Sequence, residues 1–141
     1  TTAFKYENTG RFIVSTTDNL GLDTLFEHNI WGQILKKTDP FGNTAITTYD
    51  NWGKQLTLQS SLSGTATYNY DRDNNYNSTI TQTNPDGDIS KSFSNKLGQV
   101  YKTTTKAFAN GQYVSKDLQY DILGRKIKES EPYFDGQNAS K

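Results

Sequence analysis

The chain has 141 residues with 15 acidic and 15 basic side chains, so its formal net charge at pH 7 is zero. Proteins that bind nucleic acid through its phosphates need a basic excess, so this balance argues against a nucleic-acid partner. No apolar run approaches the roughly 18 residues of a membrane-spanning helix, and cysteine is absent, which excludes disulfide and thiol chemistry. Only 32% of the residues are hydrophobic while 13% are aromatic, so aromatic side chains must supply much of the buried surface.

Segments of β-strand composition recur along the chain, separated by turns that contain glycine. Polar and apolar residues alternate within Lys54–Gln59, which is typical of a strand with one face turned away from water. No segment has the periodicity of a helix of useful length. We therefore predict an all-β fold of about twelve short strands in an up-and-down antiparallel meander. The clearest predicted strands are 11–17, 33–38, 43–49, 54–60, 99–106 and 112–120.

The turns form two interleaved series, and a period near twenty residues indicates a repeat array. The first series advances along the sequence in steps of 22, 21, 21, 24 and 26 residues, and the second lies midway between. The first series closes at Gly10, Gly32, Gly53, Asn74, Gly98 and Gly124, and the second at Gly21, Gly42, Gly64, Gly87, Gly111 and Gly136.

The residues of each turn suit a hairpin. Asp or Asn opens the turn and can bond its own backbone, and glycine supplies the positive φ that closes it. Asn74 occupies the one position of the grid without glycine, and Asn tolerates the left-handed backbone better than most residues. In a meander of such hairpins, all turns of one series lie along the same edge of the sheet.

Several turns share a longer motif. Tyr49-Asp50-Asn51-Trp52-Gly53 is followed by Lys54, and Tyr120-Asp121-Ile122-Leu123-Gly124 by Arg125, with a Pro-containing turn about eleven residues away in each case. This pattern resembles the YD repeat of Rhs proteins, and the resemblance covers essentially the whole chain. The signature residues are Tyr6, Tyr49, Asp50, Tyr70, Asp71, Tyr120, Asp121 and Arg125.

The resemblance implies a function. The family includes bacterial polymorphic toxins, the shell subunits of insecticidal toxin complexes and the animal teneurins. In these proteins the repeats wind a long β-sheet into a hollow shell, and bacterial members enclose a C-terminal toxin in it. The chain is therefore expected to be a non-catalytic segment of a spiralling shell that encapsulates or displays a toxin or effector, in a secreted or surface-displayed bacterial protein.

The same resemblance sets the expected boundaries and partners. Residues 1–141 are expected to form a single YD-repeat array, excised from a longer repeat shell. Its partners would be neighbouring repeats of the parent chain, and an encapsulated C-terminal toxin or other secretion-system subunits. A piece cut from such a sheet has two unpaired edges, so we expect it to self-associate or to be partly disordered when made alone.

Some positions depart from the repeat pattern. His28 and Ser94 replace Tyr, Glu7 replaces Asp, and Asn75 stands where a basic residue is usual. Phe93 sits one place early, which predicts a β-bulge before Gly98. Tyr at the motif position and the aromatic residue two before it share a strand face, so stacked repeats should align these rings into an aromatic ladder. Stacking of sugars on such rings is the weaker interpretation.

Trp31 and Trp52 occupy the same slot, immediately before glycine, in two consecutive turns of one edge. A large apolar residue in a hairpin turn implies that something covers it, and the neighbouring hairpin is the first candidate. A partner protein, an encapsulated cargo or a glycan is the alternative. This leaves a second possible function, an adhesin-like repeat module that binds glycans or a receptor through exposed aromatic residues.

The residues for catalysis or metal binding are few, so we predict no catalytic residue, no cofactor and no metal site. His28 is the single histidine and lies in a repeat slot. Asp71, Asp73, Asn75 and Asn77 alternate like the start of an EF-hand loop, but Tyr76 and Gln82 replace the required Gly and Glu. We also predict that Asp39-Pro40-Phe41-Gly42, which partly resembles a family self-cleavage motif, is an ordinary turn. Two stretches match the N-glycosylation pattern, Asn77-Ser78-Thr79 and Asn138-Ala139-Ser140.

Overall fold

A computed structural model describes residues 2–107 and 111–137, and across these residues the secondary structure consists of strands and turns without a helix. The strands begin within a residue or two of the predicted positions. Their bounds are β1 (Ala3–Tyr6), β2 (Ile13–Thr17), β3 (Asp23–His28), β4 (Ile34–Thr38), β5 (Thr44–Tyr49), β6 (Gln55–Ser60), β7 (Gly64–Arg72), β8 (Ser78–Thr83), β9 (Ile89–Ser94), β10 (Val100–Lys106), β11 (Tyr113–Tyr120), β12 (Lys126–Glu129) and β13 (Tyr133–Phe134).

The strands follow one another in chain order from β1 to β12, each hydrogen-bonded to the next in one open antiparallel sheet. The predicted meander is confirmed. The residue contacts divide the chain into two compact units, Thr1–Thr67 and Tyr68–Lys141, and the boundary between these ranges falls within the sequence of β7.

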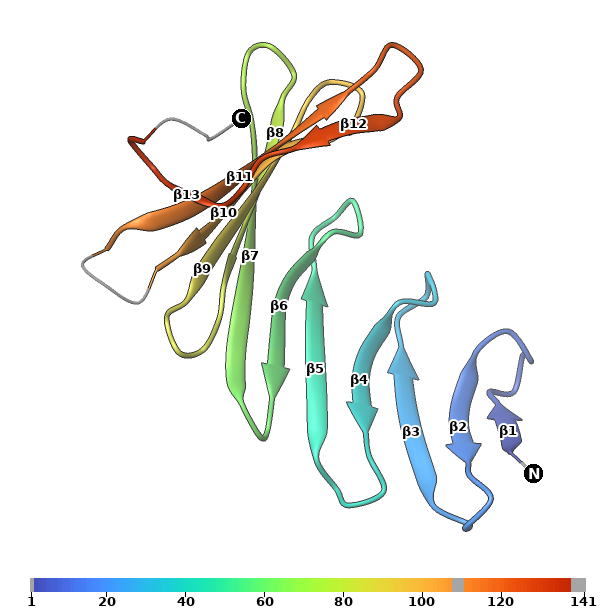
Figure 1. Ribbon diagram of the computed structural model, residues 1–141. Helices are drawn as coiled ribbons and strands as arrows, with labels where there is room; N and C mark the ends of the chain where they lie inside the picture. The colour runs from blue at the N-terminus through green and yellow to red at the C-terminus, as the bar shows by residue number, and fades with distance from the viewer. Residues whose placement is uncertain (1, 108–110, 138–141) are drawn as a thin grey trace. The chain divides into compact units, whose positions relative to one another are not determined.

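In the first unit, strands β1 to β6 lie side by side (Figure 1). Exposure alternates along β3 and along the second half of β5. In β3, the half-buried Thr24, Phe26 and His28 alternate with exposed residues such as Leu25 and Glu27. Among the described residues of the whole chain, Ala66 is the only buried hydrophobic residue. Cross-strand pairing and half-buried rings therefore hold the sheet together, rather than a conventional core.

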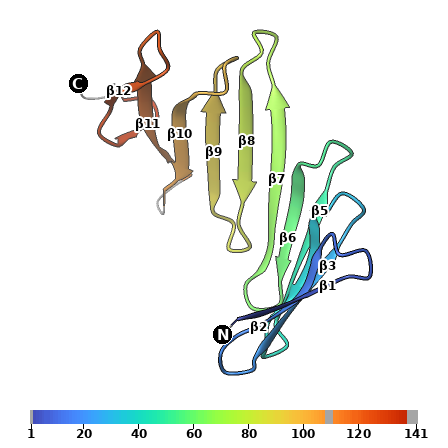
Figure 2. The same ribbon diagram turned by 90° about the vertical axis from the view of Figure 1, so that its right-hand side faces the viewer.

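In the second unit, β8 to β11 are consecutive antiparallel strands of the sheet (Figure 2). The most buried residues here are polar. Ser115 is fully buried and Thr104 is 4% exposed, and they pair across β10 and β11. Their hydroxyls lie 2.9 Å apart, so burial of polar groups on this face is compensated by hydrogen bonding.

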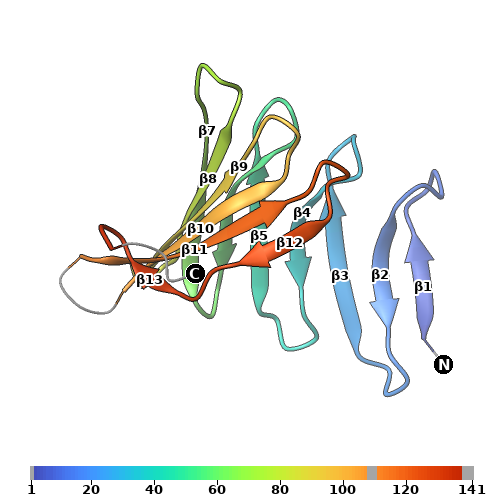
Figure 3. The ribbon, with the colours of Figure 1, turned by 45° about the horizontal axis from the view of Figure 1, so that its top comes forward.

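The last edge of this unit is a single strand interrupted once. β12 and β13 both pair antiparallel with β11 (Figure 3). β12 pairs with residues Leu118–Tyr120 of β11, and β13 pairs with Val114–Ser115. The interruption falls at residues 130–132, where Pro132 has no N–H to give to a ladder. Because β12 and β13 together form one edge strand, the thirteen strands of the described chain correspond to the predicted twelve.

A bulge recurs in five of the first-series hairpins. The register shifts by one residue just after the turn, leaving Val14, Leu35, Leu56, Tyr101 and Ile127 as the extra residues. The bulge predicted before Gly98 is wrong in position, because it lies after that glycine, at Tyr101 on β10. Phe93 pairs with Lys102 on one side of this shift and with Thr79 on the other strand, and the four other hairpins have the same bulge, so the early position of Phe93 was not the signal for it.

The prediction that Asn74 closes a turn in the left-handed conformation is also wrong. Tyr76, with φ of 64°, is the one non-glycine residue of the described chain with positive φ. Its N–H donates to the Asp73 carbonyl at 3.1 Å, as Gly53 N–H does to Asp50. The turn is therefore Asp73-Asn74-Asn75-Tyr76, two residues later than predicted, because Tyr70 and Asp71 continue strand β7.

Candidate functional site

The repeated turn is the structural unit from which a site must be built. In the turn at Asp50, one carboxylate oxygen accepts hydrogen bonds from the backbone N–H groups of Trp52 (2.9 Å) and Lys54 (2.8 Å). The Gly53 N–H donates to the Asp50 carbonyl at 3.1 Å, and the Asp50 N–H donates to the Lys54 carbonyl at 2.8 Å. A single Asp thus satisfies two backbone donors and fixes the hairpin. The same side-chain pattern occurs at Asp18, Asn29, Asp39, Asp50, Asp73, Asn95 and Asp121.

In three of these turns, at Asp39, Asp73 and Asp121, the hydrogen bonds favour the ionised carboxylate. The Arg125 backbone N–H and then its guanidinium, 2.7 Å from the second carboxylate oxygen, lower the pKa of Asp121. The side-chain amides of Asn43 and Asn77 similarly lower the pKa of Asp39 and Asp73. The signature basic residue Arg125 therefore pairs with the Asp of its own turn.

The tyrosine of the motif joins neighbouring strands. The Tyr49 hydroxyl donates to the Ile34 carbonyl at 3.0 Å, and the Tyr120 hydroxyl donates to the Val100 carbonyl at 2.9 Å. Both acceptors lie at the bulge of the preceding hairpin. The tyrosine therefore satisfies a carbonyl next to the irregular part of the ladder. Tyr6, on the edge strand β1, is 51% exposed.

The residue after the turn glycine reaches the next turn along the same edge. The Gln33 amide donates to the Gly53 carbonyl at 2.9 Å and would lie 2.9 Å from a Cβ at Gly53. Gln99 approaches Gly124 in the same way, at 3.2 Å from such a Cβ. Phe12 covers Gly32 so closely that a Cβ there would overlap its ring. The sequence analysis did not predict the contact between this glutamine and the next turn, although the pattern Asn-x-x-Gly-Gln at 29–33 and again at 95–99 indicates it.

All eleven turn glycines have positive φ, between 67° and 93°. Gly64 differs from the others in that it is the first residue of β7 and pairs with Ser60. A Cβ added at Gly42 or Gly87 would point into open space, so those positions require only the left-handed backbone. Gly32 and Gly53 are required for two reasons. Each has the left-handed backbone, and a side chain of the neighbouring hairpin occupies the space that a Cβ would need.

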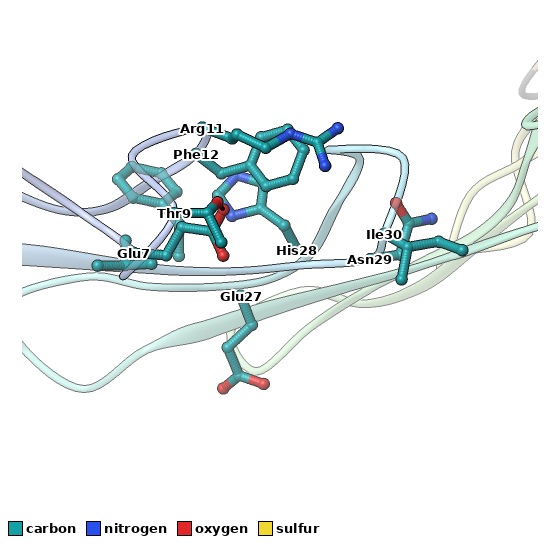
Figure 4. A pocket seen from close by; sticks show the side chains of 10 residues that line it. Glu7, Thr9, Arg11, Phe12, Glu27, His28, Asn29 and Ile30 are labelled. Atoms are coloured by element: carbon teal, nitrogen blue, oxygen red, sulfur yellow. Dashed lines mark hydrogen bonds between the residues drawn. The ribbon is translucent and has the colours of Figure 1, made fainter.

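The rings around His28 form a second feature (Figure 4). His28 stacks on Phe12 with ring centroids 5.5 Å apart, and Phe26 lies 6.4 Å away, while the Arg11 guanidinium sits 5.1 Å from the Phe12 ring. Glu27 points to the opposite side of the strand. The His28 Nδ1 atom is buried without a hydrogen-bond partner. His28 therefore occupies the tyrosine position of its repeat, packs against two phenylalanine rings and lacks the tyrosine hydroxyl bond.

Replacing His28 by tyrosine should restore that bond. By register, the Ile13 carbonyl stands where Ile34 and Val100 stand in the other repeats. We expect His28→Tyr to raise the free energy of unfolding by about 0.5–1.5 kcal/mol over His28→Phe, which has the ring without the hydroxyl. Chemical denaturation of both variants measures the difference, and equal stabilities would show that no such bond forms.

Trp31 and Trp52 are 79% and 85% exposed, so the prediction that a neighbouring hairpin covers them is wrong for the chain described. They line one shallow depression of about 650 Å³ together with Leu35 and Tyr49. Both indoles belong to turn residues, and the bulged residue Leu35 is part of the same lining. Polar groups complete the depression: Asn29, Gln33, Asp50 and Asn51.

A polar cluster in the second unit was not predicted. Asp135 accepts hydrogen bonds from the buried Ser115 hydroxyl at 2.7 Å and from the Lys102 ammonium at 3.0 Å. The Ser115 hydrogen bond, followed by that of Lys102, lowers the pKa of Asp135. Nearby, the Tyr133 hydroxyl lies 2.9 Å from both carboxylate oxygens of Asp117. The cluster fastens the segment after Pro132 to the sheet, and its bonded pairs are 16 to 33 positions apart, too distant for a sequence motif.

The residues considered for other sites have structural partners. Asp73 accepts from Asn75 and Asn77, and Asp71 accepts from the Asn69 amide at 2.8 Å. In the described part of the chain, no three His, Asp or Glu side chains gather as a metal site would require. No helix suitable for crossing a membrane occurs there either. Asn138 of the second glycosylation pattern lies outside the described residues, and Asn77 of the first donates to Asp73 at 2.9 Å.

Comparison with known proteins rests on structure. No family model matches the sequence, and no curated protein matches it. The crystal structure of TcdB2-TccC3 superposes with a TM-score of 0.72 at 15% identity, over 94% of this chain and 10% of that one. This is the fold of an Rhs/YD-repeat shell.

Two other shell structures align over 99% of the chain at 14% identity, with lower TM-scores. They are TcdB2-TccC3-TEV, at 0.45, and the Photorhabdus luminescens Tc holotoxin pore with a TccC3 mutation, at 0.44. The chain spans about a tenth of the length of these shell proteins. In the two clearest YD turns, Asp50 and Asp121 accept hydrogen bonds from the turn backbone, and Tyr49 and Tyr120 donate to a carbonyl of the preceding strand.

Proposed function

We propose that this chain is a non-catalytic segment of an Rhs-type shell that encloses a C-terminal toxin or effector. The observation that carries the proposal is the open meander of hairpins, superposable on TcdB2-TccC3 over 94% of the chain. Its physical role would be that of a wall. Hydrogen bonds between consecutive strands, with Tyr49, Gln33 and their equivalents joining the hairpins, keep such a wall closed without a thick core.

The proposal extends to partners and location. Within the described chain β1 pairs with β2 alone, and all four of its residues are exposed. An exposed strand edge favours pairing with another strand, so neighbouring repeats of a longer parent chain would cover it. The enclosed toxin and other secretion-system subunits would be further partners, and the parent protein would be secreted or surface-displayed by a bacterium.

Protease protection tests this role. The product of the complete open reading frame should contain a C-terminal segment that resists protease while the shell is folded and is cut rapidly once the shell is denatured. The same segment expressed alone is the control and should be cut at the rapid rate. A segment cut equally fast in both settings, or an open reading frame with nothing to enclose, would refute encapsulation.

A second candidate function is a binding module that uses exposed aromatic residues for a glycan or a receptor. The observation that favours it is the exposure of Trp31 and Trp52, which lie on adjacent hairpins of one edge and line the same depression. Exposed tryptophans are uncommon unless a partner covers them, and Trp is enriched among the residues that dominate binding energy.

Trp52→Ala should separate binding from stability. Because the side chain is 85% exposed, we expect the free energy of unfolding to change by no more than about 0.5 kcal/mol. Binding to a glycan array or a candidate receptor should be lost. Phe41→Ala is the matched control, because Phe41 occupies the same slot at 82% exposure on the opposite series of turns. Marked destabilisation by Trp52→Ala, with no ligand found for the parent chain, would contradict the binding role.

A further inference from the structure

The spacing of the two tryptophans restricts what can bind them. Trp31 precedes Gly32 between β3 and β4, and Trp52 precedes Gly53 between β5 and β6, so the two turns lie two strands apart along one edge. At about 4.8 Å per strand this is about 9.6 Å. The depression is continuous between them, with Leu35 and Tyr49 in its lining. A ligand that contacts both indoles must therefore repeat an apolar group at close to that distance.

We propose that this depression binds a proline-rich segment in the polyproline II conformation. That helix has three residues per turn and rises about 3.1 Å per residue, so prolines at positions i and i+3 lie about 9.3 Å apart on one side. One proline ring packs on Trp31 and the other on Trp52. The inference rests on the second proposed function and names the chemical class of its partner.

The chemistry of the lining agrees with the spacing. A polyproline II segment has no internal hydrogen bonds, so its carbonyl oxygens are free to accept. Each indole carries one N–H donor beside its apolar face, which suits a ligand that alternates rings and carbonyls. Asn51 adds an amide group to the same depression, while the Gln33 amide is bonded to Asn29 and Gly53.

The backbones that carry the two tryptophans are also held in place before binding. The Trp31 backbone N–H donates to the Asn29 side chain at 3.0 Å, and the Trp52 backbone N–H donates to Asp50 at 2.9 Å. Both backbones are therefore fixed by their turns. A stiff proline helix meeting fixed turns loses little conformational entropy on binding, which favours affinity.

Charge indicates the residues that flank the prolines. Asp50 is the only charged residue in the described lining, and no basic residue accompanies it. This favours a ligand with Arg or Lys next to the prolines and disfavours an anionic ligand such as a sulfated glycan or a phosphopeptide.

Intrinsic fluorescence provides a direct test, because Trp31 and Trp52 are the only tryptophans in the chain. An arginine followed by eight prolines is the probe, and a length-matched Gly-Ser peptide with the same arginine is its control. We expect saturable quenching or a blue shift with the proline peptide alone. Trp31→Ala and Trp52→Ala should each weaken binding at least about tenfold, read from the remaining tryptophan. Leu97→Ala, in the same slot of another turn, should leave binding unchanged.

The outcomes are distinguishable. Circular dichroism and thermal melting establish that each variant is folded. Equal responses to the two peptides, or no response to either, would overturn the inference. Cellohexaose and chitohexaose are titrated in parallel: a saturable response to one of these with none to the proline peptide would reject the proline ligand while supporting the binding module. No response to any of these probes, nor to a glycan array, would count against both the proline ligand and the binding module. The protease-protection test of the shell would be unaffected by that result.

Discussion

Replacing Gly32 by alanine should destabilise the chain by about 2–5 kcal/mol, the largest effect expected of any single substitution here. Two costs add. Gly32 has φ of 83°, and a left-handed backbone costs a residue with a Cβ about 1–2 kcal/mol. The new Cβ would also overlap the Phe12 ring, and overpacking of this kind costs about 1–3 kcal/mol. The ring stacks on His28, so a movement that relieved the overlap would disturb that contact.

Gly42→Ala is the matched control, because Gly42 has φ of 84° and a Cβ there would meet no neighbouring residue within 4 Å. It should show the backbone cost alone, about 1–2 kcal/mol. Urea denaturation measures both, and Phe12→Ala combined with Gly32→Ala should recover part of the difference in a double-mutant cycle. Equal costs at the two glycines would mean that the hairpins do not constrain each other through Phe12.

Asp135→Ala is expected to cost about 1–2 kcal/mol in the second unit. The substitution leaves the hydroxyl of Ser115, which is fully buried, with Thr104 as its remaining partner, and it leaves the Lys102 ammonium without its carboxylate. Water can reach part of the vacated space, since the Asp135 side chain is 41% exposed, and this keeps the cost moderate. Asp135→Asn retains an acceptor for Ser115 and should lose less. Hydrogen exchange of β11 and β13 measures both, and unchanged exchange in the alanine variant would contradict this account.

The acidic groups of the second unit should also make its stability depend on pH. Hydrogen bonds from Lys116 and Lys126 lower the pKa of Glu129 from 4.5 to about 2, and Ser115 and Lys102 lower that of Asp135. A lowered pKa in the folded state contributes stability above the unfolded pKa and loses it as pH falls through the folded value. The stability of this unit should therefore decrease between about pH 4.5 and pH 2, and Glu129→Gln should flatten that decrease in urea midpoints measured across the range.

Much of the fold was readable from local patterns. Asp50 and Gly53, or Asp121 and Gly124, carry their own hydrogen-bonding and φ requirements within five residues, so turn positions and the strands between them follow from the sequence. The prediction failed at Asn74 because two Asp residues, Asp71 and Asp73, could each open a turn. Strand β7 continues through Asp71 to Arg72, so the turn opens at Asp73, and this placed a tyrosine, Tyr76, in the left-handed position.

The candidate site was predicted only in part. The shared slot of Trp31 and Trp52 was visible in the sequence, but their exposure was not, because exposure depends on where the neighbouring hairpins end. The contacts of Gln33 with Gly53 and of Phe12 with Gly32 join residues 20 positions apart through space. The Ser115–Asp135 bond depends on a strand that restarts after Pro132, which no local pattern indicates.

The sequence by itself determined the hairpins, since a turn is fixed by the backbone preferences and side-chain oxygens of four or five adjacent residues. Only the tertiary structure decided which side chains cross from one hairpin to the next, where the bulges fall and which rings remain open to solvent. These depend on the register between strands, and register is set by the combined pairing of residues that are distant in sequence.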